Sequence, residues 1–131
     1  MIKRANLILY VSDQQRSRDF YSQVLQLAPT LDVPGMTEFA LSDTLVLGLM
    51  PEKGIVRLLG NSIKDPALAG GIPRAELYLS VDQPQQYHQR ALQAGATELK
   101  AYALMNWGDM AAYSLDPDGH VLVFASTANA S

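Results

Sequence analysis

The sequence predicts an α+β fold built from two copies of a βαβββ module. A pattern of one polar residue followed by Leu-x-Leu-x-Val occurs twice, at residues 6–11 and at residues 76–81. Each copy then passes an acidic residue, Asp13 or Asp82, and enters a stretch whose apolar residues have helical spacing. The repeated unit is therefore larger than a strand, and each half of the chain opens with a strand and a helix.

Alternation along the two opening strands separates two kinds of side chain. Successive side chains of a strand point to opposite faces, so the leucines and the valine of each copy share one face. The opposite face carries Asn6, Ile8 and Tyr10 in one copy and Glu76, Tyr78 and Ser80 in the other. The first face is suited to packing against a helix, and the second is free to present polar and aromatic groups.

The first module is predicted to span about residues 1–50. Residues 3–11 alternate like a strand, and residues 13–27 have the spacing of an amphipathic helix that Pro29 ends. Three short strands are then expected, separated by Pro-Gly and Ser-Asp turns, at residues 30–33, 37–41 and 44–50.

A connector of about residues 51–73 leads to the second module, of about residues 74–126. The connector is rich in Gly and Pro around one apolar patch, and we expect one helical turn in it. A connector of this length is more often functional, or a cover over something, than idle. The second module repeats the order, with a strand at 74–81, a helix at 84–94 and strands at 97–103, 108–115 and 120–125.

Length and composition predict one domain over residues 1–131. With 48% hydrophobic and 18% charged residues, the chain has an ordinary globular composition and is long enough to bury a core. It contains no cysteine, which excludes a disulfide framework, a thiolate zinc site and a cysteine nucleophile. The lack of cysteine also fits a reducing cytoplasm, the location that we expect.

The charge pattern argues against nucleic-acid and membrane partners. The formal net charge is -3, and the lysines and arginines are scattered along the sequence rather than clustered. The first residues lack the features of a signal peptide, and no apolar run has the length of a membrane span. The expected partners are a small organic ligand and a second copy of the chain in a homodimer.

The order of these motifs resembles the vicinal oxygen chelate superfamily, which contains glyoxalase I, bleomycin-resistance proteins and extradiol dioxygenases. The resemblance covers nearly the whole chain and lies in residues 10–13 leading into Phe20, Tyr21 and Leu25, in Gln-Ala-Gly-Ala at 93–96, and above all in Tyr-Ser-Leu-Asp-Pro-Asp-Gly-His at 113–120. It implies paired βαβββ modules whose two curled mixed sheets enclose a cavity, with the helices outside.

The resemblance also implies where metal ligands would be. Metal-using members take ligands from the first and last strands of each module, and these positions are Asn6, about Leu47, Glu76 and Val123 in this sequence. Glu76 alone is a good ligand for a divalent ion, whereas the metals concerned need several His or carboxylate donors. The sequence therefore predicts no bound metal and no other cofactor.

Glu76 has two interpretations at this stage. It is either a hydrogen-bonded remnant of an ancestral metal position or a group that contacts the ligand or transfers a proton as a catalytic base. The histidines are assigned structural positions, His88 on the second helix and His120 at the turn before the last strand.

Aromatic and apolar side chains complete the predicted site. They are typical of core packing, but a cavity with such a lining and a few polar groups is also what an organic-ligand site requires. The predicted ligand-binding residues are Asn6, Tyr10, Phe39, Leu47, Glu76, Tyr78, Trp107, Met110, Tyr113 and Val123.

The function expected from the sequence is metal-independent binding of a small organic ligand, with aromatic and drug-like molecules as candidates, in a cavity between the modules. The alternative is a lyase of the glyoxalase kind or an enzyme of the dioxygenase kind, in which Glu76 acts as base or metal ligand. A third possibility is an interaction domain whose cavity is filled by its own side chains.

Overall fold

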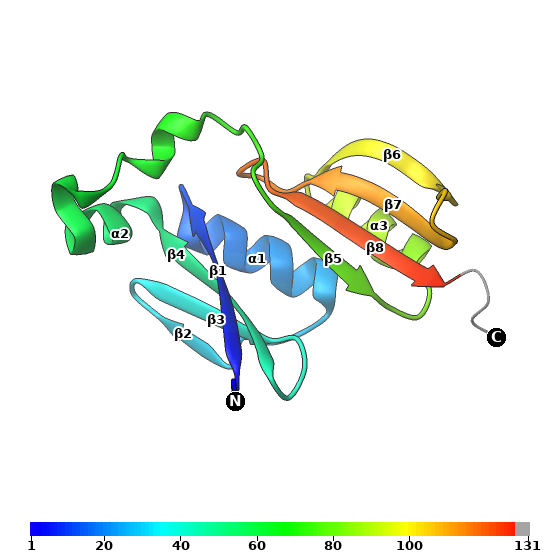
Figure 1. Cartoon of the computed structure of the whole chain (residues 1–131), viewed down its shortest axis with the longest axis horizontal. Helices are drawn as coiled ribbons and strands as arrows, with labels where there is room; N and C mark the ends of the chain where they lie inside the picture. The colour runs from blue at the N-terminus through cyan, green and yellow to red at the C-terminus, as the bar shows by residue number, and fades with distance from the viewer. Residues whose placement is uncertain (128–131) are drawn as a thin grey trace. The chain divides into compact units, whose positions relative to one another are not determined.

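The computed structural model describes residues 1–127 and contains two four-stranded sheets (Figure 1). The first sheet has the strand order β1 (Ala5–Val11), β4 (Leu45–Pro51), β3 (Met36–Ala40) and β2 (Leu31–Val33). The second has the order β5 (Glu76–Ser80), β8 (Val121–Thr127), β7 (Asp109–Leu115) and β6 (Thr97–Leu104).

The two sheets have the same topology, which confirms the duplicated βαβββ plan and the α+β class. In each sheet the first strand pairs in parallel with the last strand of its module, β1 with β4 and β5 with β8. The other pairs, β4 with β3, β3 with β2, β8 with β7 and β7 with β6, are antiparallel. Both sheets are therefore mixed, and neither closes on itself.

The predicted helices are present with slightly shorter ends. Helix α1 spans Gln14–Leu25, and the side chain of Asp13 caps its start by accepting a hydrogen bond from the backbone N–H of Arg16. Helix α3 spans Pro84–Gln93 and packs against β7 and β8 (Figure 1). Its proline occupies the first helical position, where the missing N–H has no partner to lose.

The connector contains more helix than the sequence suggested. Helix α2 spans Glu52–Leu59 and is followed by two 3₁₀ turns, η1 (Gly60–Ser62) and η2 (Pro66–Ala69). Ile55 is the buried residue of α2, which packs against β4 and β1. This tertiary contact stabilises a helix of two turns that its own sequence would scarcely hold. No helix among residues 1–127 is long and apolar enough to cross a membrane.

Contacts within the chain divide it into two compact units. The first consists of Met1–Ser22 and Gln26–Gly70, and the second of Gln23–Leu25 with the chain from Gly71 onward. The last turn of α1 belongs to the second unit, where the Nε of Arg90 donates to the carbonyl oxygen of Val24 at 3.1 Å. The boundary near Gly70 lies inside the predicted connector, and the single domain expected from the sequence stays a prediction.

Each unit buries one face of its sheet. In the first unit Leu9 and Val11 of β1 are buried with Leu47 and Leu49 of β4, as the alternation of the opening strand requires. In the second unit the buried ring of Phe124 in β8 lies 5.0 Å from the ring of Tyr87 in α3. The other face of each sheet is then available for polar and aromatic side chains.

Candidate functional site

The candidate site lies on the face of the second sheet that points away from α3. Register places Tyr78 of β5 beside Val123 of β8, and Val123 beside Tyr113 of β7. Alternation adds Glu76 to this face from β5 and Asp109 from the start of β7. We call the surface formed by Glu76, Tyr78, Asp109, Tyr113 and Val123 the Tyr78 face.

A hydrogen-bonded triad fixes the aromatic groups at one end of the Tyr78 face. The hydroxyl of Tyr78 donates to Oδ2 of Asp109 at 2.5 Å and accepts a bond from Nε1 of Trp107 at 3.1 Å. Charge-assisted bonds of this kind are roughly twice as strong as bonds between neutral groups. The carboxylate therefore orients the phenol, and the phenol in turn orients the indole.

The turn between β6 and β7 brings Trp107 to this position. The backbone N–H of Gly108 donates to the carbonyl of Met105 at 3.1 Å, and the N–H of Met105 donates to the carbonyl of Asp109 at 2.8 Å. Gly108 has φ = 100°, a backbone conformation that residues other than glycine rarely adopt. A glycine directly after Trp107 thus allows the chain to turn tightly beneath the indole.

Small and apolar side chains lie buried beneath the Tyr78 face. The buried cluster there consists of Met105, Ala111, Val123 and Ala125, with Tyr78, Ala103, Tyr113 and Val121 packed against it. The indole of Trp107, by contrast, is 54% exposed. The surface thus combines two half-buried phenols, which cover this buried cluster, with an indole that remains available for contact.

The phenols of this face are held neutral. Burial raises the pKa of Tyr78, and the hydrogen bond to Asp109 raises it further. Burial also raises the pKa of Tyr113, with added contributions from the negative charges of Glu76 and Asp109. Both hydroxyls therefore stay protonated throughout the physiological pH range.

Asn6 and Tyr10 lie on one face of β1 in the first unit. The side chain of Asn6 donates to Oε2 of Glu38 at 3.3 Å and accepts from Nε of Arg4 at 3.2 Å. Tyr10 is 38% exposed. The carboxylate beside Asn6 was not expected from the sequence, although Glu38 lies one residue from the predicted Phe39.

Phe39 and Leu47, two of the predicted ligand-binding residues, lie on the opposite face of the first sheet from Asn6. Both are fully buried, and they pair with each other across β3 and β4. Their face is that of Thr37, whose hydroxyl accepts a bond from Gln14 of α1 at 2.9 Å. The face of Asn6 instead carries Gly48 of β4, because a register that differs by one residue exchanges the two faces of a strand.

Met110 also lies apart from the predicted site residues of the second unit. It follows Asp109 directly in β7, so alternation turns it to the face of Ala112 and Ser114. The structure thus brings together Glu76, Tyr78, Trp107, Tyr113 and Val123 and leaves Met110 on the opposite face.

Asp109 is the residue that sequence reasoning missed. It stands two residues after Trp107 and four before Tyr113 in a segment that was predicted to be a strand. Counting back from Tyr113 in steps of two reaches Asp109, so alternation alone could have placed it on the Tyr78 face. The signal available in the sequence was a carboxylate at the start of a strand that also carries Tyr113.

Donors for a metal ion gather at one place among residues 1–127, the turn before β8. Possible ligand atoms of Asp116, Asp118 and His120 all lie within 4.8 Å of one another. However, Oδ1 of Asp116 accepts from the backbone N–H groups of Asp118 and His120, both at 2.9 Å, and its Oδ2 lies 2.9 Å from Nδ1 of His120. These contacts build the Asp-Pro-Asp-Gly turn and use the carboxylate.

The positions at which the resemblance implies metal ligands offer poor donors. In the first unit the amide of Asn6 is bonded to Arg4 and Glu38. In the second unit Glu76 pairs along the sheet with Val121, and Val123 is apolar. This donor set does not fit a transition-metal centre, which needs several imidazole or carboxylate ligands. Metal independence itself stays a prediction.

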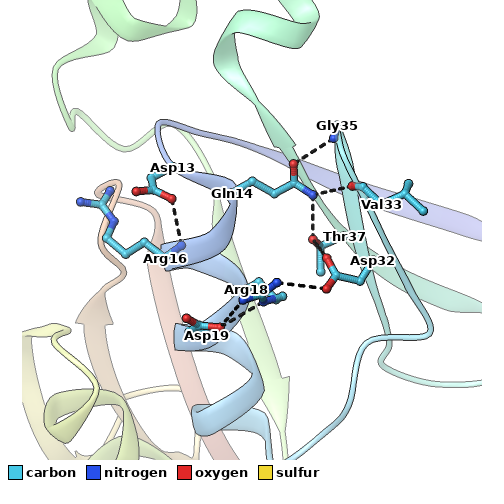
Figure 2. Close-up of polar contacts among 9 residues, drawn as sticks. All are labelled: Asp13, Gln14, Arg16, Arg18, Asp19, Asp32, Val33, Gly35 and Thr37. Carbon is cyan, nitrogen blue, oxygen red and sulfur yellow. Dashed lines mark hydrogen bonds and ion pairs between the residues drawn. The ribbon is translucent and has the colours of Figure 1, made fainter.

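A polar network joins α1 to the hairpin of β2 and β3 in the first unit (Figure 2). The side-chain nitrogen of Gln14 donates to the carbonyl of Val33 at 2.8 Å and to the hydroxyl of Thr37, while its oxygen accepts from the N–H of Gly35 at 3.0 Å. Gln14 therefore satisfies backbone groups of the hairpin and fixes the hairpin to the helix.

Arg18 lies in the same network, beside a shallow hollow of about 360 Å³. Its guanidinium forms ion pairs with Asp19 at 3.0 Å and with Asp32 at 3.1 Å (Figure 2). The hollow is lined by Gln14, Gln15, Arg18, Asp32, Val33 and Pro34. The Arg18–Asp32 ion pair, like the hydrogen bonds of Gln14, holds α1 to the hairpin. Because the charges of Arg18 and Asp32 are used in this contact, we interpret the hollow as a structural feature rather than as an ion-binding site.

Comparison with known proteins gives one family and several relatives. Residues 3–124 match the model of the Glyoxalase/Bleomycin resistance protein/Dioxygenase superfamily. An uncharacterised protein of Mycobacterium bovis is 30% identical over 115 residues, covering 86% of this chain and 75% of that protein. An uncharacterised protein of Mycobacterium tuberculosis is also 30% identical over 115 residues, and the matched region covers 86% of this chain and 67% of that protein.

Solved structures share the fold. A glyoxalase-related enzyme from Fulvimarina pelagi superposes with a TM-score of 0.81 at 21% identity, covering 97% of this chain and 89% of that one. A glyoxalase/bleomycin resistance protein/dioxygenase family enzyme from Burkholderia phytofirmans has a TM-score of 0.72 at 19% identity, with 96% and 98% covered. At these identities the similarity concerns the fold alone.

Proposed function

Because the chain belongs to the glyoxalase/bleomycin resistance protein/dioxygenase superfamily, we propose that it binds a small organic molecule on the Tyr78 face without the help of a metal ion. The ligand packs its apolar body against the exposed indole of Trp107 and the half-buried rings of Tyr78 and Tyr113. Tyr113 and Glu76 provide polar contacts beside it. The family description names bleomycin resistance proteins beside enzymes, which is consistent with a binding function.

The hydrogen-bonded triad is the observation that carries the proposal. An indole that is 54% exposed would ordinarily be free to reorient, but Trp107 is held by the hydroxyl of Tyr78, which Asp109 holds in turn. A side chain fixed before binding loses less conformational freedom when the ligand arrives. Stacking on an aromatic ring contributes about 0.5–1.5 kcal/mol beyond the burial of its area.

Trp107 makes the proposal easy to test, since it is the single tryptophan of the chain. Its indole N–H gives one resolved signal in a proton–nitrogen correlation spectrum. We expect aromatic molecules from a small panel to shift this signal in a saturable manner and to raise the unfolding temperature. A panel that leaves both unchanged would contradict the proposal.

Matched variants separate the site from the rest of the sheet. Tyr78→Phe removes the hydroxyl that holds Trp107, and we expect it to weaken binding by about tenfold, the effect of one lost positioning bond. Tyr87→Phe makes the same change in α3, which packs on the other face of the sheet, and should leave binding unchanged. If the two variants changed the affinity equally, the ligand would not bind on the Tyr78 face.

An enzymatic function is the second candidate, and the exposed carboxylate of Glu76 favours it. Glu76 lies on the Tyr78 face, where its charge acts on Tyr113, and no hydrogen bond from the described residues engages its oxygens. Such a group can accept a proton from a bound ligand. Loss of turnover in Glu76→Gln, with ligand binding intact, would support an enzyme, whereas an unchanged rate would exclude Glu76 from the chemistry.

We also propose a homodimer, supported by the free sheet edges. Strands β1 and β5 lie at the ends of their sheets and pair on one side only within the described chain. Exposed strand edges are ready to pair with further chains unless something covers them. Light scattering of the purified protein should give a mass of about twice 14.3 kDa, and a monomeric mass would contradict the proposal. Residence in the cytoplasm stays a prediction.

A further inference from the structure

Most hydrogen-bond donors of the Tyr78 face are already used within the protein. The Tyr78 hydroxyl donates to Asp109, and the indole N–H of Trp107 donates to Tyr78. Among the described residues, none donates to Oδ1 of Asp109 or to either carboxylate oxygen of Glu76. Tyr113 keeps a hydroxyl that can donate or accept. The capacity left for a ligand is therefore mainly that of acceptors.

The same acceptors carry negative charge. The carboxylates of Glu76 and Asp109 both act on Tyr113, and in the part of the chain that the structure describes neither takes part in an ion pair. Two basic residues lie close to this face in register or in sequence: Lys100, paired with Tyr113 across β6 and β7, and Arg74, two residues before β5. Both are exposed, and among the described residues neither forms an ion pair with Glu76 or Asp109.

Three aromatic rings accompany these charges. The faces of tryptophan and tyrosine rings attract cations, and the attraction increases as the cation loses its water. Trp107 presents an exposed ring, and Tyr78 and Tyr113 present half-buried rings that pack against the buried apolar cluster. Anions have little to gain here, because the donors that would hold them are occupied.

We propose that the ligand of the Tyr78 face is an organic cation, an aromatic or apolar molecule with a protonated amine, a guanidinium or a quaternary ammonium group. The cationic group lies between Glu76, Oδ1 of Asp109 and the aromatic rings, while the apolar body of the ligand packs against the exposed ring of Trp107. This inference rests on the proposed binding function and adds the charge class of the ligand to it.

Three probes with the same ring system test the proposal: naphthylmethylammonium, naphthylmethanol and naphthoate, which are cationic, neutral and anionic at neutral pH. Affinities are measured by calorimetry and by the indole signal of Trp107. We expect the ammonium to bind at least about tenfold more tightly than the alcohol, as one cation–π or ion contact provides. The carboxylate should bind most weakly.

Charge-removing variants assign the preference to the named residues. In Glu76→Gln and in Asp109→Asn the advantage of the ammonium over the alcohol should fall several-fold and become less dependent on salt. Glu76 is exposed and engages no described partner, so its variant should fold normally even if Asp109→Asn does not. Asp43→Asn, an exposed change in the turn between β3 and β4, is the control for net charge.

The outcomes distinguish the two proposals. If the ammonium and the alcohol bind equally well to the unaltered protein, the inference of a cationic ligand is wrong while ligand binding on the Tyr78 face stands. If the preference exists but survives both variants, the cation lies elsewhere, and the inference is also wrong. If none of the three probes shifts the Trp107 signal, both proposals fail.

Discussion

Asp109 connects the two aromatic side chains of the Tyr78 face. One of its carboxylate oxygens accepts the bond from Tyr78, whose oxygen accepts the bond from Trp107. The remaining oxygen faces no described donor. The residue thus combines a positioning role with a charge that a ligand can use, and the two contributions can be measured separately.

Replacing Asp109 with asparagine should make Tyr78 more acidic. Burial is the first cause of the raised pKa of Tyr78, and the bond to the Asp109 carboxylate is the second. An amide keeps an acceptor but removes the negative charge that disfavours tyrosinate. We expect the pKa of Tyr78 to move down toward its ordinary value in Asp109→Asn. Carbon-13 signals of labelled tyrosine follow the titration, and an unshifted midpoint would contradict the assigned role.

Tyr78→Phe should alter stability in a pH-dependent way. At neutral pH it removes two hydrogen bonds of a half-buried hydroxyl, with an expected loss of about 1–2 kcal/mol in the free energy of unfolding. The folded-state pKa of Tyr78 is raised, so its contribution is complete below the unfolded pKa and disappears as pH rises through the folded value. The variant should therefore lose less stability than the unaltered protein above about pH 10.

Denaturant unfolding between neutral and strongly alkaline pH provides the measurement for Tyr78→Phe. Tyr87→Phe, which changes a tyrosine of α3 that packs against the other face of the same sheet, is the control. If the stability of Tyr78→Phe and of the unaltered protein declined in parallel above pH 10, the phenol of Tyr78 would not be the group that links the native state to protons.

Turns determine how the strands of the second sheet are positioned. Two turn glycines, Gly119 and Gly95, differ in how much space surrounds them. Gly119, in the turn before β8, has φ = 91°, and a Cβ added there would lie 2.5 Å from the carbonyl oxygen of Gly71. Gly95, after α3, has φ = 111°, but a Cβ there would meet nothing within 4 Å. The first glycine is required by conformation and by space, and the second by conformation alone.

Gly119→Ala and Gly95→Ala therefore form a matched pair. Both force alanine into a backbone region that it rarely adopts, at a cost of about 1–3 kcal/mol. Gly119→Ala adds a clash with backbone atoms of Gly71, which cannot move aside as a flexible side chain can, so we expect it to lose about 1–3 kcal/mol more. Urea unfolding of both variants measures the difference. Equal losses in the free energy of unfolding would show that the turn at Gly119 can move away from Gly71 without cost.

At the scale of the whole molecule, the duplicated strand pattern was sufficient to predict the fold. Leu9 and Val11 are buried and Asn6 and Tyr10 exposed, as alternation required. Helix α2 was underestimated because its stability comes from the packing of Ile55 rather than from its own sequence. The extent of regular structure in the connector depends on contacts that local patterns do not contain.

The candidate site was predicted less completely because faces depend on register. Within one strand, alternation correctly put Glu76 and Tyr78 together. Between strands, the pairing of Asn6 with Val46 decides that Gly48 and not Leu47 shares its face, and no local pattern specifies that pairing. Asp109 could have been found by alternation from Tyr113, whereas its bond to Tyr78 on another strand could not.

Metal independence is the prediction that concerns the whole molecule. The first-unit position of Asn6 offers an amide that is already bonded, and the second-unit position of Glu76 offers one carboxylate beside valines. The cluster of Asp116, Asp118 and His120 is occupied by the hydrogen bonds of its turn. We expect protein purified without a chelator to contain far less than one equivalent of zinc, iron, nickel or manganese.

Elemental analysis and thermal unfolding check this expectation together. A metal held by the native state, present at 100 times its dissociation constant, would stabilise the protein by about 2.7 kcal/mol. Each of the four metals should therefore leave the unfolding temperature of the chelator-treated protein unchanged. One tightly held equivalent, together with a raised unfolding temperature that Glu76→Gln abolishes, would overturn metal independence and favour the enzymatic alternative. A raised temperature that survives in Glu76→Gln but disappears in His120→Asn would instead assign the ion to the turn before β8.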